Sequence, residues 1–268
     1  MSEKHSRQSF LGEDAEEHLA QCVVGIVGLG GGGSHIVQQL SHIGFKNYVI
    51  FDHDTVEETN LNRLVGAKRI DVTAETAKLH IAKMMIYGLE PDADVEAHAC
   101  RWQEKPEALR RCHIIFGCVD TYTGRHELEI CARRYLINYI DVGMDVNQAG
   151  DTAPVIGGQV ILSSPDGLCM QCMGFITDEV LAREGRRYGD AGGRPQVVWS
   201  NGVLASTAVG VAVDLVTDWS RSKRGFIYLE YDGNRNTVQP HWNIRNLQGM
   251  TCIHYPPDQV GDPIFTRL

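Results

Sequence analysis

A glycine-rich turn near the start of the chain has the residues and spacing of a phosphate-binding turn. Gly28-Leu29-Gly30-Gly31-Gly32-Gly33 follows the apolar residues 22–27 and precedes a helix-like segment that begins at Ser34. Glycines let the backbone approach phosphate oxygens, and the exposed N–H groups of a first helical turn attract negative charge. Asp52 closes the next apolar run about 20 residues later, where a carboxylate can bind ribose hydroxyls. The pattern predicts a nucleotide site, with a purely structural turn as the alternative.

The loop after Asp52 is polar where a dehydrogenase would usually continue into a helix. It presents the amide of Asn60 and the guanidinium of Arg63 beside the expected ribose site, and Lys78 follows further along. Converging positive charges suit a reaction at phosphorus, where charge builds on the equatorial oxygens. Asp120, at the end of another apolar run, could hold Mg²⁺ against the phosphates. Each residue also has an ordinary alternative, as a solvated surface charge or, for Asp120, as a helix cap.

Taken in order, these residues resemble the ThiF/MoeB adenylyltransferase family, the bacterial relatives of ubiquitin-activating enzymes. The resemblance runs from Arg7 to the Cys252 region and so covers nearly the whole chain. It implies an enzyme that uses ATP to activate a C-terminal carboxylate as an acyl-adenylate, with release of pyrophosphate. The usual carboxylate in this family is the Gly-Gly tail of a ubiquitin-like protein. The matching positions are Arg7, Gln8, Gly28, Gly30, Gly31, Gly33, Ser34, Asp52, Asp54, Val56, Glu57, Asn60, Leu61, Arg63, Lys78, Pro91 and Asp120.

The resemblance also implies a role for each residue. Arg63 and Lys78 would stabilise the pentacoordinate α-phosphorus, Asp120 would bind Mg²⁺, and Arg7 would reach into the site of a partner subunit in a homodimer. The reaction needs positioning and charge neutralisation but no general base, because a carboxylate is already a nucleophile at neutral pH. The residues implied to bind the nucleotide are Gly28, Gly30, Gly31, Gly33, Asp52, Asn60, Arg63 and Lys78.

A C-x-x-C pair, Cys169 and Cys172, follows a strand-like run and is typical of a metal knuckle or a redox pair. The family places a structural zinc here, with a second C-x-x-C near the C-terminus. This chain departs from that pattern, because Cys252 is followed by His254 and then by Tyr255. We expect His254 to be the fourth zinc ligand, since Cys₃His sites are common. The alternatives are a metal-free remnant and ordinary buried thiols.

The cysteine that carries the substrate in some members of this family is missing. In those members it precedes a Gly-Val-Leu/Met-Ala stretch, which is Gly202–Ala205 here, and no cysteine lies between Met173 and Asn201. We therefore expect adenylation without a covalent enzyme intermediate, followed by transfer to an external thiol or conjugating-type acceptor. Four other cysteines fall in or beside expected core elements, where a thiol is inert packing: Cys22, Cys112, Cys118 and Cys131.

Alternating strands and helices should position these residues. This order predicts an α/β fold with a Rossmann-like, doubly wound and mostly parallel sheet, whose ligands lie at the carboxyl ends of the strands. Asp52 and Asp120 would share that edge. The expected strands are residues 22–27, 48–51, 95–100, 113–119 and 138–142, and the expected helices are residues 13–20, 34–43, 73–89 and 123–136.

The pattern changes after residue 150. Strand-like residues 155–162 and 226–231 predict a mixed or antiparallel extension of the sheet, and residues 201–219 a helix of small residues. We interpret the Gly/Arg-rich residues 183–195 as a mobile loop. The expected organisation is one adenylation domain over residues 1–268. Its nucleotide-binding half spans about 20–145, and the half with the zinc knuckle and crossover loop spans about 146–268.

Composition narrows the remaining functions. The formal net charge of −9 argues against a nucleic-acid partner, because phosphate binding favours a basic surface. No run approaches the roughly 20 apolar residues that span a bilayer. The N-terminus offers no apolar core of a signal peptide, and eight cysteines fit reduced thiols plus a metal site. We therefore expect a cytoplasmic protein with no membrane partner.

Three other functions fit parts of the pattern. The same chemistry could act on a peptide C-terminus, another small carboxylate or a modified RNA base, although the acidic charge disfavours RNA. An NAD-dependent dehydrogenase fits the glycine turn, but Arg63, Lys78 and the missing helix after Asp52 count against it. A catalytically silent nucleotide-binding scaffold would need none of the matched charged residues.

Overall fold

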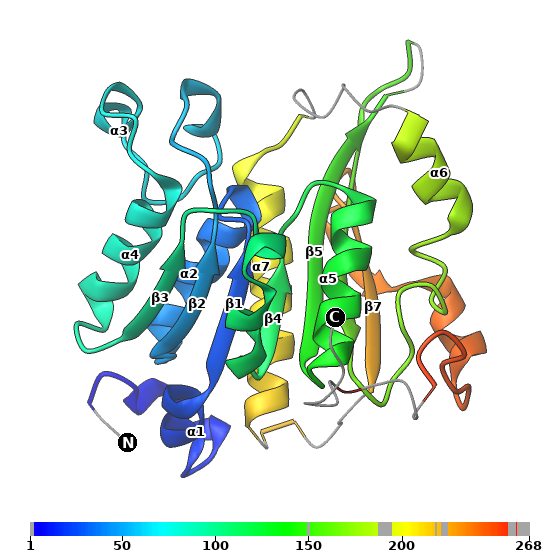
Figure 1. The fold of residues 1–268 in the computed structure, drawn as a ribbon, viewed down its shortest axis with the longest axis horizontal. Helices are drawn as coiled ribbons and strands as arrows, with labels where there is room; N and C mark the ends of the chain where they lie inside the picture. The colour runs from blue at the N-terminus through cyan, green and yellow to red at the C-terminus, as the bar shows by residue number, and fades with distance from the viewer. Residues whose placement is uncertain are drawn as a thin grey trace.

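One eight-stranded sheet runs through the molecule, in the order β3-β2-β1-β4-β5-β6-β7-β8 (Figure 1). The computed structural model describes residues 3–148, 151–186, 195–217, 219–220, 225–256 and 261. The first five strands of that order are parallel and the last three are antiparallel to their neighbours. The strands are β1 (Val23–Val27), β2 (Asn47–Phe51), β3 (Asp94–His98), β4 (Ile114–Gly117), β5 (Asn138–Asn147), β6 (Val155–Ser163), β7 (Phe226–Asp232) and β8 (Thr237–Pro240). This confirms the doubly wound, mostly parallel sheet with an antiparallel extension.

Helices cover both faces of the sheet. On one face α2, α4 and α7 pack over β1, β2 and β5, and on the other α5 packs over β4 and β5, with α6 beside it (Figure 1). The helices are α1 (Ala15–Gln21), α2 (Gly31–Ile43), α3 (Arg69–Thr73), α4 (Lys78–Leu89), α5 (Tyr122–Arg134), α6 (Asp178–Arg186) and α7 (Val198–Val216). Short 3-10 helices span Ser6–Leu11, Glu58–Asn60, Trp102–Glu104, Pro106–Arg111 and Trp242–Leu247.

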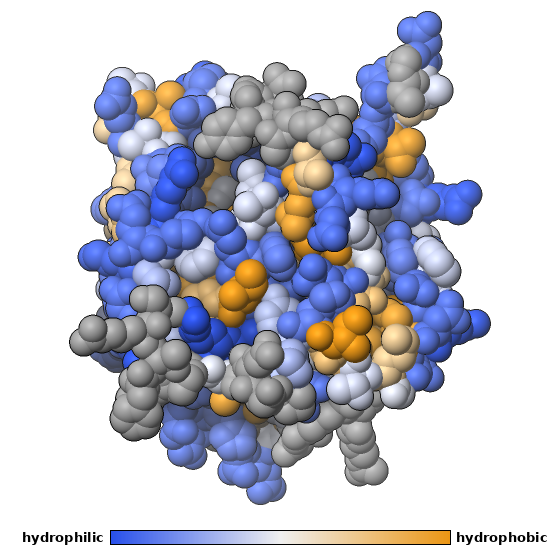
Figure 2. Space-filling view, turned by 45° about the vertical axis from the view of Figure 1, so that its right-hand side comes forward, coloured by the Kyte–Doolittle hydropathy of each residue, from blue (hydrophilic) through white to orange (hydrophobic). Residues whose placement is uncertain are grey.

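The central strands are buried on both faces, which explains their continuous apolar runs. Val24 and Ile26 of β1 face the core under α2 and α7, whereas Val27 belongs to the core on the other face. The face shown in Figure 2 is mostly hydrophilic, with separate hydrophobic patches.

Helix α2 begins three residues earlier than expected, at Gly31 rather than Ser34. The first helical hydrogen bond runs from Ser34 N to Gly30 O, so the glycine turn itself forms the first turn of the helix. A Cβ atom at Gly33 would lie 2.0 Å from the carbonyl oxygen of Gly28, so only glycine fits there. The end of α2 is as expected, because Gly44 takes the left-handed conformation with φ of +111°.

The expected single helix over residues 73–89 is wrong. The chain forms α3 and α4 with a turn between them, in which Glu75 has φ of +49°. The turn pairs with the loop after β2 instead of continuing a helix, since Val56 N donates to Thr76 O (2.8 Å) and Lys78 N donates to Asp54 O (3.0 Å). Lys78 is therefore the first residue of α4, and its position is fixed by the loop that carries Asp54.

The second half of the chain holds further differences. Helix α7 starts at Val198 and ends at Val216, while α6 and the edge strand β8 were not anticipated. The first residues of the expected loop over 183–195 belong to α6, and residues 187–194 lie outside the described residues. Helix α7 is long and apolar enough to cross a membrane by length and composition alone, but half of it is buried within the fold.

We predict that Gly33→Ala lowers the free energy of unfolding by about 1–3 kcal/mol, because the new methyl group overpacks against the Gly28 carbonyl. Urea unfolding measures the change. Gly32→Ala is the matched control, since its Cβ would meet nothing closer than Cys118 Sγ at 3.8 Å. Equal stability of the two variants would contradict the packing assigned to Gly33.

Candidate active site

A cleft of about 510 Å³ opens at the carboxyl ends of the parallel strands, large enough for a small-molecule ligand. Its wall combines the start of α2, the loop after β2, the start of α4, the loop after β4, β5 and the start of α7. The polar side chains and glycines that matter most are Gly28, Gly30, Gly31, Gly32, Asp52, Asp54, Arg63, Lys78, Asp120, Arg125, Gly143, Gln196 and Asn201. Apart from Gly33, Asn60 and Arg7, the residues expected at the nucleotide site therefore meet in one place.

The glycine turn is shaped by close backbone contacts. Gly28 has φ of +90°, and a Cβ there would lie 2.5 Å from the Cys118 carbonyl oxygen. A Cβ at Gly31 would lie 2.5 Å from Asn201 Nδ2, whereas Gly30 has open space around it. The N–H groups at the start of α2 precede its hydrogen-bond ladder and lie at the cleft, so they can bind an anion.

Asp52 joins the glycine turn to the loop that follows β2. One carboxylate oxygen accepts a hydrogen bond from Leu29 N (2.6 Å) and the other from Asp54 N (2.8 Å), while the residue is only 9% exposed. Burial raises the pKa of Asp52, and the charge of Lys78 together with these two bonds offsets only part of that rise. The carboxylate thus depends on nearby positive charge.

Lys78 places its ammonium group at the floor of the cleft. Its Nζ lies 2.7 Å from Asp54 Oδ2, and its side chain is 11% exposed. Burial raises the pKa of Asp54, but the hydrogen bond and charge of Lys78 outweigh that effect and hold the pKa below its usual value. Lys78 is therefore a charged, nearly buried group beside two carboxylates.

Arg63 is held by its own loop, and Asn60 builds that loop. The Arg63 Nη1 donates to Thr59 O (2.6 Å) and to Asn62 Oδ1 (3.0 Å). Asn60 is buried, and its Oδ1 accepts a hydrogen bond from Glu57 N (3.1 Å). Since Asn60 does not line the cleft, its expected contact with the triphosphate stays a prediction.

Asp120 follows β4 and projects into the cleft. Its carboxylate makes no hydrogen bond or ion pair with the part of the chain that the structure describes. The helix-cap alternative is wrong, because Thr121 caps α5 by accepting a hydrogen bond from Gly124 N (3.1 Å). Glu184 of α6 accepts the next bonds, from Tyr122 N and Thr123 N. Asp120 is thus free to bind a cation.

A buried ion pair that the sequence did not predict, between Arg125 and Asp141, lies beside Asp120. Arg125 Nη1 donates to Asp141 Oδ2 (2.6 Å), and both side chains are nearly or fully buried. Asp141 also accepts hydrogen bonds from Tyr139 Oη and Gln159 Nε2, each at 3.0 Å. A Cβ at Gly143 would lie 2.4 Å from Arg125 Nη2, so glycine makes room for the guanidinium. The sequence offered one signal for this pair, the carboxylate of Asp141 inside the apolar strand 138–142, because a buried charge needs a partner.

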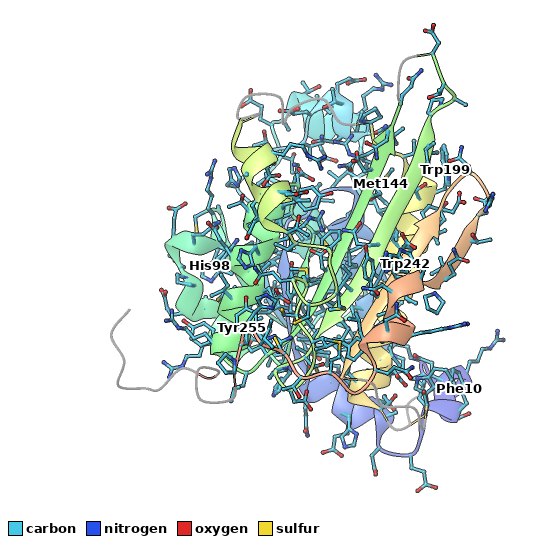
Figure 3. The ribbon with its side chains drawn as sticks, turned by 90° about the vertical axis from the view of Figure 1, so that its right-hand side faces the viewer. Phe10, His98, Met144, Trp199, Trp242 and Tyr255 are labelled. Carbon is cyan, nitrogen blue, oxygen red and sulfur yellow. The ribbon has the colours of Figure 1, made fainter. Side chains whose placement is uncertain are left out.

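The cleft continues into a smaller hollow of about 100 Å³ between β5 and α5. Arg63, Asp120 and Arg125 line both spaces, and Tyr122, Asp145 and Phe175 close the hollow. The sequence predicts a core aromatic at Trp199, just before the Gly202–Ala205 stretch, but Trp199 lies at the start of α7 and is 55% exposed, so that prediction is wrong. Figure 3 places Trp199 and Met144, which lines both spaces, at the same upper end of the molecule.

A cluster of metal-binding side chains lies elsewhere, at the amino edge of the parallel strands. Cys169, Cys172, Cys252 and His254 bring their ligand atoms within 4.8 Å of one another. The Cys172 and Cys252 sulfurs are 3.7 Å apart, and His254 Nδ1 lies 3.2 Å from Cys172 Sγ. A tetrahedral zinc with bonds of about 2.3 Å to sulfur needs sulfurs about 3.8 Å apart. The donor set and its spacing fit a zinc ion.

This knuckle is far from the cleft along the sheet. Ser163, the last residue of β6, pairs with Tyr139 near the start of β5, so the chain leaves β6 at the edge opposite the cleft. Tyr255, next to His254, accordingly lies well below Met144 in Figure 3. The cluster can fix structure but cannot touch a ligand in the cleft.

Arg7 also lies at the edge opposite the cleft. It is exposed in the 3-10 helix Ser6–Leu11, and neighbouring Gln8 donates to the carbonyl of Ile43 at the last turn of α2 (3.4 Å). It therefore does not line the cleft of its own chain.

Burial favours the neutral thiol at Cys252, but hydrogen bonds from the backbone of Tyr255 and His254 outweigh it and lower the pKa of that group. Four cysteines outside the metal-ligand cluster give no sign of an activated nucleophile. Burial raises the pKa of Cys22, Cys112, Cys118 and Cys131 to about 12, which keeps these thiols protonated. Cys118 and the half-buried Cys100 line the cleft, and Cys100 was not singled out from the sequence.

A family model and several relatives match the sequence of this chain. A model of the ThiF family matches residues 3–249. The SAMP-activating enzyme E1 of Haloferax volcanii is 26% identical over 63% of this chain and 60% of its own length. The NEDD8-activating enzyme E1 catalytic subunit of Dictyostelium discoideum is 32% identical over 48% of this chain and 27% of its own. The chain thus spans between about a quarter and three fifths of the length of these relatives.

Solved structures share the fold. Escherichia coli MccB, solved with AMPCPP and MccA, superimposes with a TM-score of 0.71 at 18% identity, over 90% of this chain and 71% of MccB. PaaA superimposes with a TM-score of 0.68 at 20% identity, over 89% of this chain and 82% of PaaA. At these identities the likeness establishes the architecture alone.

We predict that Asp141→Leu lowers the free energy of unfolding by about 3–5 kcal/mol, because it leaves the Arg125 charge buried without a partner. Urea unfolding measures the change, with Asp145→Leu on the same strand as the control. The double variant Arg125→Met, Asp141→Leu should recover part of the loss. If Asp141→Leu is as stable as the parent protein, the ion pair between Arg125 and Asp141 does not stabilise the fold.

Proposed function

Because the chain belongs to the ThiF family, we propose that it is an ATP-dependent adenylyltransferase that activates a carboxylate as an acyl-adenylate. The observation that carries this proposal is the meeting of a glycine turn, Asp52, two cationic side chains and the Asp120 carboxylate in one cleft. A dehydrogenase would need the glycine turn and Asp52 but neither Arg63 nor Lys78.

In this proposal the donor carboxylate attacks the α-phosphorus of ATP. A bond forms between a carboxylate oxygen and the α-phosphorus, and the bond from the α-phosphorus to the bridging oxygen breaks, so pyrophosphate leaves with that electron pair. The start of α2 binds the phosphates and Asp52 binds the ribose. Lys78 and Arg63 neutralise the negative charge that grows on the phosphate oxygens. Asp120 would hold Mg²⁺, which supplies further charge neutralisation when bound.

The donor we favour is the C-terminal tail of a ubiquitin-like protein. The relatives named as activating enzymes for such modifiers support this choice. Arg63, which lines both the cleft and the smaller hollow, offers a positive charge for a carboxylate. A peptide C-terminus is the second candidate, because the neighbour MccB was solved with MccA and AMPCPP. The sequence has no cysteine between Met173 and Asn201, so we propose that the acyl group passes directly to an external thiol or conjugating-type acceptor.

We also propose a homodimer and a structural zinc. Arg7 is exposed at the edge opposite its own cleft, which supports a role in the site of a second copy. Cys169, Cys172, Cys252 and His254 would bind the zinc. The zinc would join the segment after β6 to the segment after the 3-10 helix Trp242–Leu247.

We predict ATP–pyrophosphate exchange that depends on a donor with a free carboxylate. The probe is a ubiquitin-like protein ending in Gly-Gly, and the same protein with a C-terminal carboxamide is the control because it lacks the nucleophile. Lys78→Ala should reduce exchange by about 10²- to 10³-fold, as expected for a residue that stabilises transition-state charge. Lys83→Ala, on the same helix, should leave it unchanged. Asp120→Ala should abolish exchange while leaving the thermal stability intact.

The same reactions test the transfer step. Intact-mass spectra should show no covalent adduct between this chain and the donor. A reducible adduct that disappears when one cysteine becomes serine would contradict direct transfer.

Stabilisation by NAD but not by Mg-ATP, measured by thermal shift, would contradict the proposed nucleotide.

For the metal, we predict about one zinc per chain in protein purified without chelators, with zinc–sulfur bonds near 2.3 Å by X-ray absorption. Cys169→Ser should lower both zinc content and melting temperature, because the knuckle loses one of four ligands. Cys100→Ser, outside the cluster, should change neither zinc content nor the absorption spectrum. Freshly purified protein without zinc would refute the site.

A further inference from the structure

The start of α7 forms part of the wall around the phosphate end of the cleft. Asn201, in its first turns, is 5% exposed, and its Nδ2 donates to Val197 O (3.1 Å) while packing against Gly31. Gln196, just before the helix, lines both the cleft and the smaller hollow. The residues from 196 to 201 therefore touch both proposed binding spaces.

Asn62 connects this segment to Arg63. Its amide nitrogen donates to the backbone carbonyl of Gln196 (3.0 Å), and its amide oxygen accepts a hydrogen bond from Arg63 Nη1 (3.0 Å). A single side chain thus joins a backbone group before α7 to a guanidinium in the cleft. The two bonded residues are 134 positions apart in sequence, so only the fold brings them together.

Arg63 has few other restraints. Its Nη1 donates to Thr59 O (2.6 Å), and its Cδ lies 3.3 Å from the point where a Cβ of Gly31 would stand. Thr59 belongs to the same short loop as Arg63, so that bond holds the side chain to its own loop. The bond to Asn62 is the contact that makes the guanidinium position depend on the start of α7.

Resting on the proposed function, we propose that Asn62 is a positioning residue that couples Arg63 to the start of α7. A ligand whose phosphates hold Arg63 also stabilises the backbone at residues 195–201 through this amide. Conversely, a donor tail that orders Gln196 fixes Arg63 for the α-phosphate. Such coupling is reciprocal because it is a difference in free energy between the same states.

A purely structural role for Asn62 would act differently. Asn62 is exposed, and both of its hydrogen bonds lie at the surface, so their loss should hardly change global stability. Coupling instead changes the local order at residues 195–201 and its response to phosphates. These quantities can be measured separately from unfolding.

The test uses Asn62→Asp and Asn62→Leu. Aspartate still accepts from Arg63 but cannot donate to Gln196 O, whereas leucine loses both bonds. Without any ligand, amide hydrogen exchange at residues 196–201 should be several-fold faster in both variants at unchanged urea stability. With Mg²⁺ and AMPCPP, exchange in this segment should slow in the parent protein but not in Asn62→Asp. By calorimetry, Asn62→Leu should weaken AMPCPP by about 10-fold and leave adenosine unchanged.

Asn246→Asp and Asn246→Leu are the matched controls, since Asn246 is an exposed asparagine whose amide donates to nearby Asn243 rather than to the start of α7. Ligand-free exchange at residues 196–201 that matches the parent in both Asn62 variants would overturn the inference. Equal protection by AMPCPP in the parent and in Asn62→Asp would also overturn it, while leaving the proposed function intact. If AMPCPP does not bind the parent protein, the proposed function fails, and the ligand-free measurement still decides whether Asn62 ties the two segments together.

Discussion

The two hydrogen bonds that the Asp52 carboxylate accepts hold the nucleotide end of the cleft in shape. One bond fixes Leu29 inside the glycine turn, and the other fixes Asp54, whose side chain pairs with Lys78. The backbone carbonyl of Asp54 also accepts a hydrogen bond from the N–H of Lys78, the first residue of α4. Burial raises the pKa of Asp52, and the charge of Lys78 acts in the opposite direction by favouring the ionised carboxylate. The turn, the loop and the helix are thus organised around one carboxylate.

Features that depend on neighbouring residues in the chain could be predicted from the sequence. The buried strands were visible as apolar runs, and the glycine turn, Asp52 and Asp120 were placed at the carboxyl edge because parallel strands share that edge. The start of α4 could not be predicted, since it depends on the contact of Lys78 N with Asp54 O, 24 residues earlier in the chain. The start of α2 depends on local contacts, the bond from Ser34 N to Gly30 O and the packing of Gly33 against Gly28, and was placed three residues too late because glycine is a poor helix former. The short edge strand β8 carries too little apolar pattern to be recognised.

The site shows the same division. A C-x-x-C spacing indicates a knuckle, but only the fold brings His254 to Cys172. Arg125 and Asp141 lie on different elements, so their pairing has no local signature. Asn60 is the opposite case: its place in the motif indicated contact with a ligand, yet its side chain organises the loop that carries Arg63. The motif therefore identifies Asn60 as part of the site, but only its hydrogen bond to Glu57 shows that it also shapes the loop.

Helices α2 and α7 begin at the same edge of the sheet, where Gly31 meets Asn201. Each helix carries a macrodipole whose positive end lies at its first turn, so two such ends face the cleft together with Arg63 and Lys78. The chain as a whole is an anion with a formal net charge of −9. At this edge the helix ends and the cationic side chains therefore oppose the repulsion that the overall charge exerts on an anionic ligand. Because both effects are electrostatic, added salt weakens each of them.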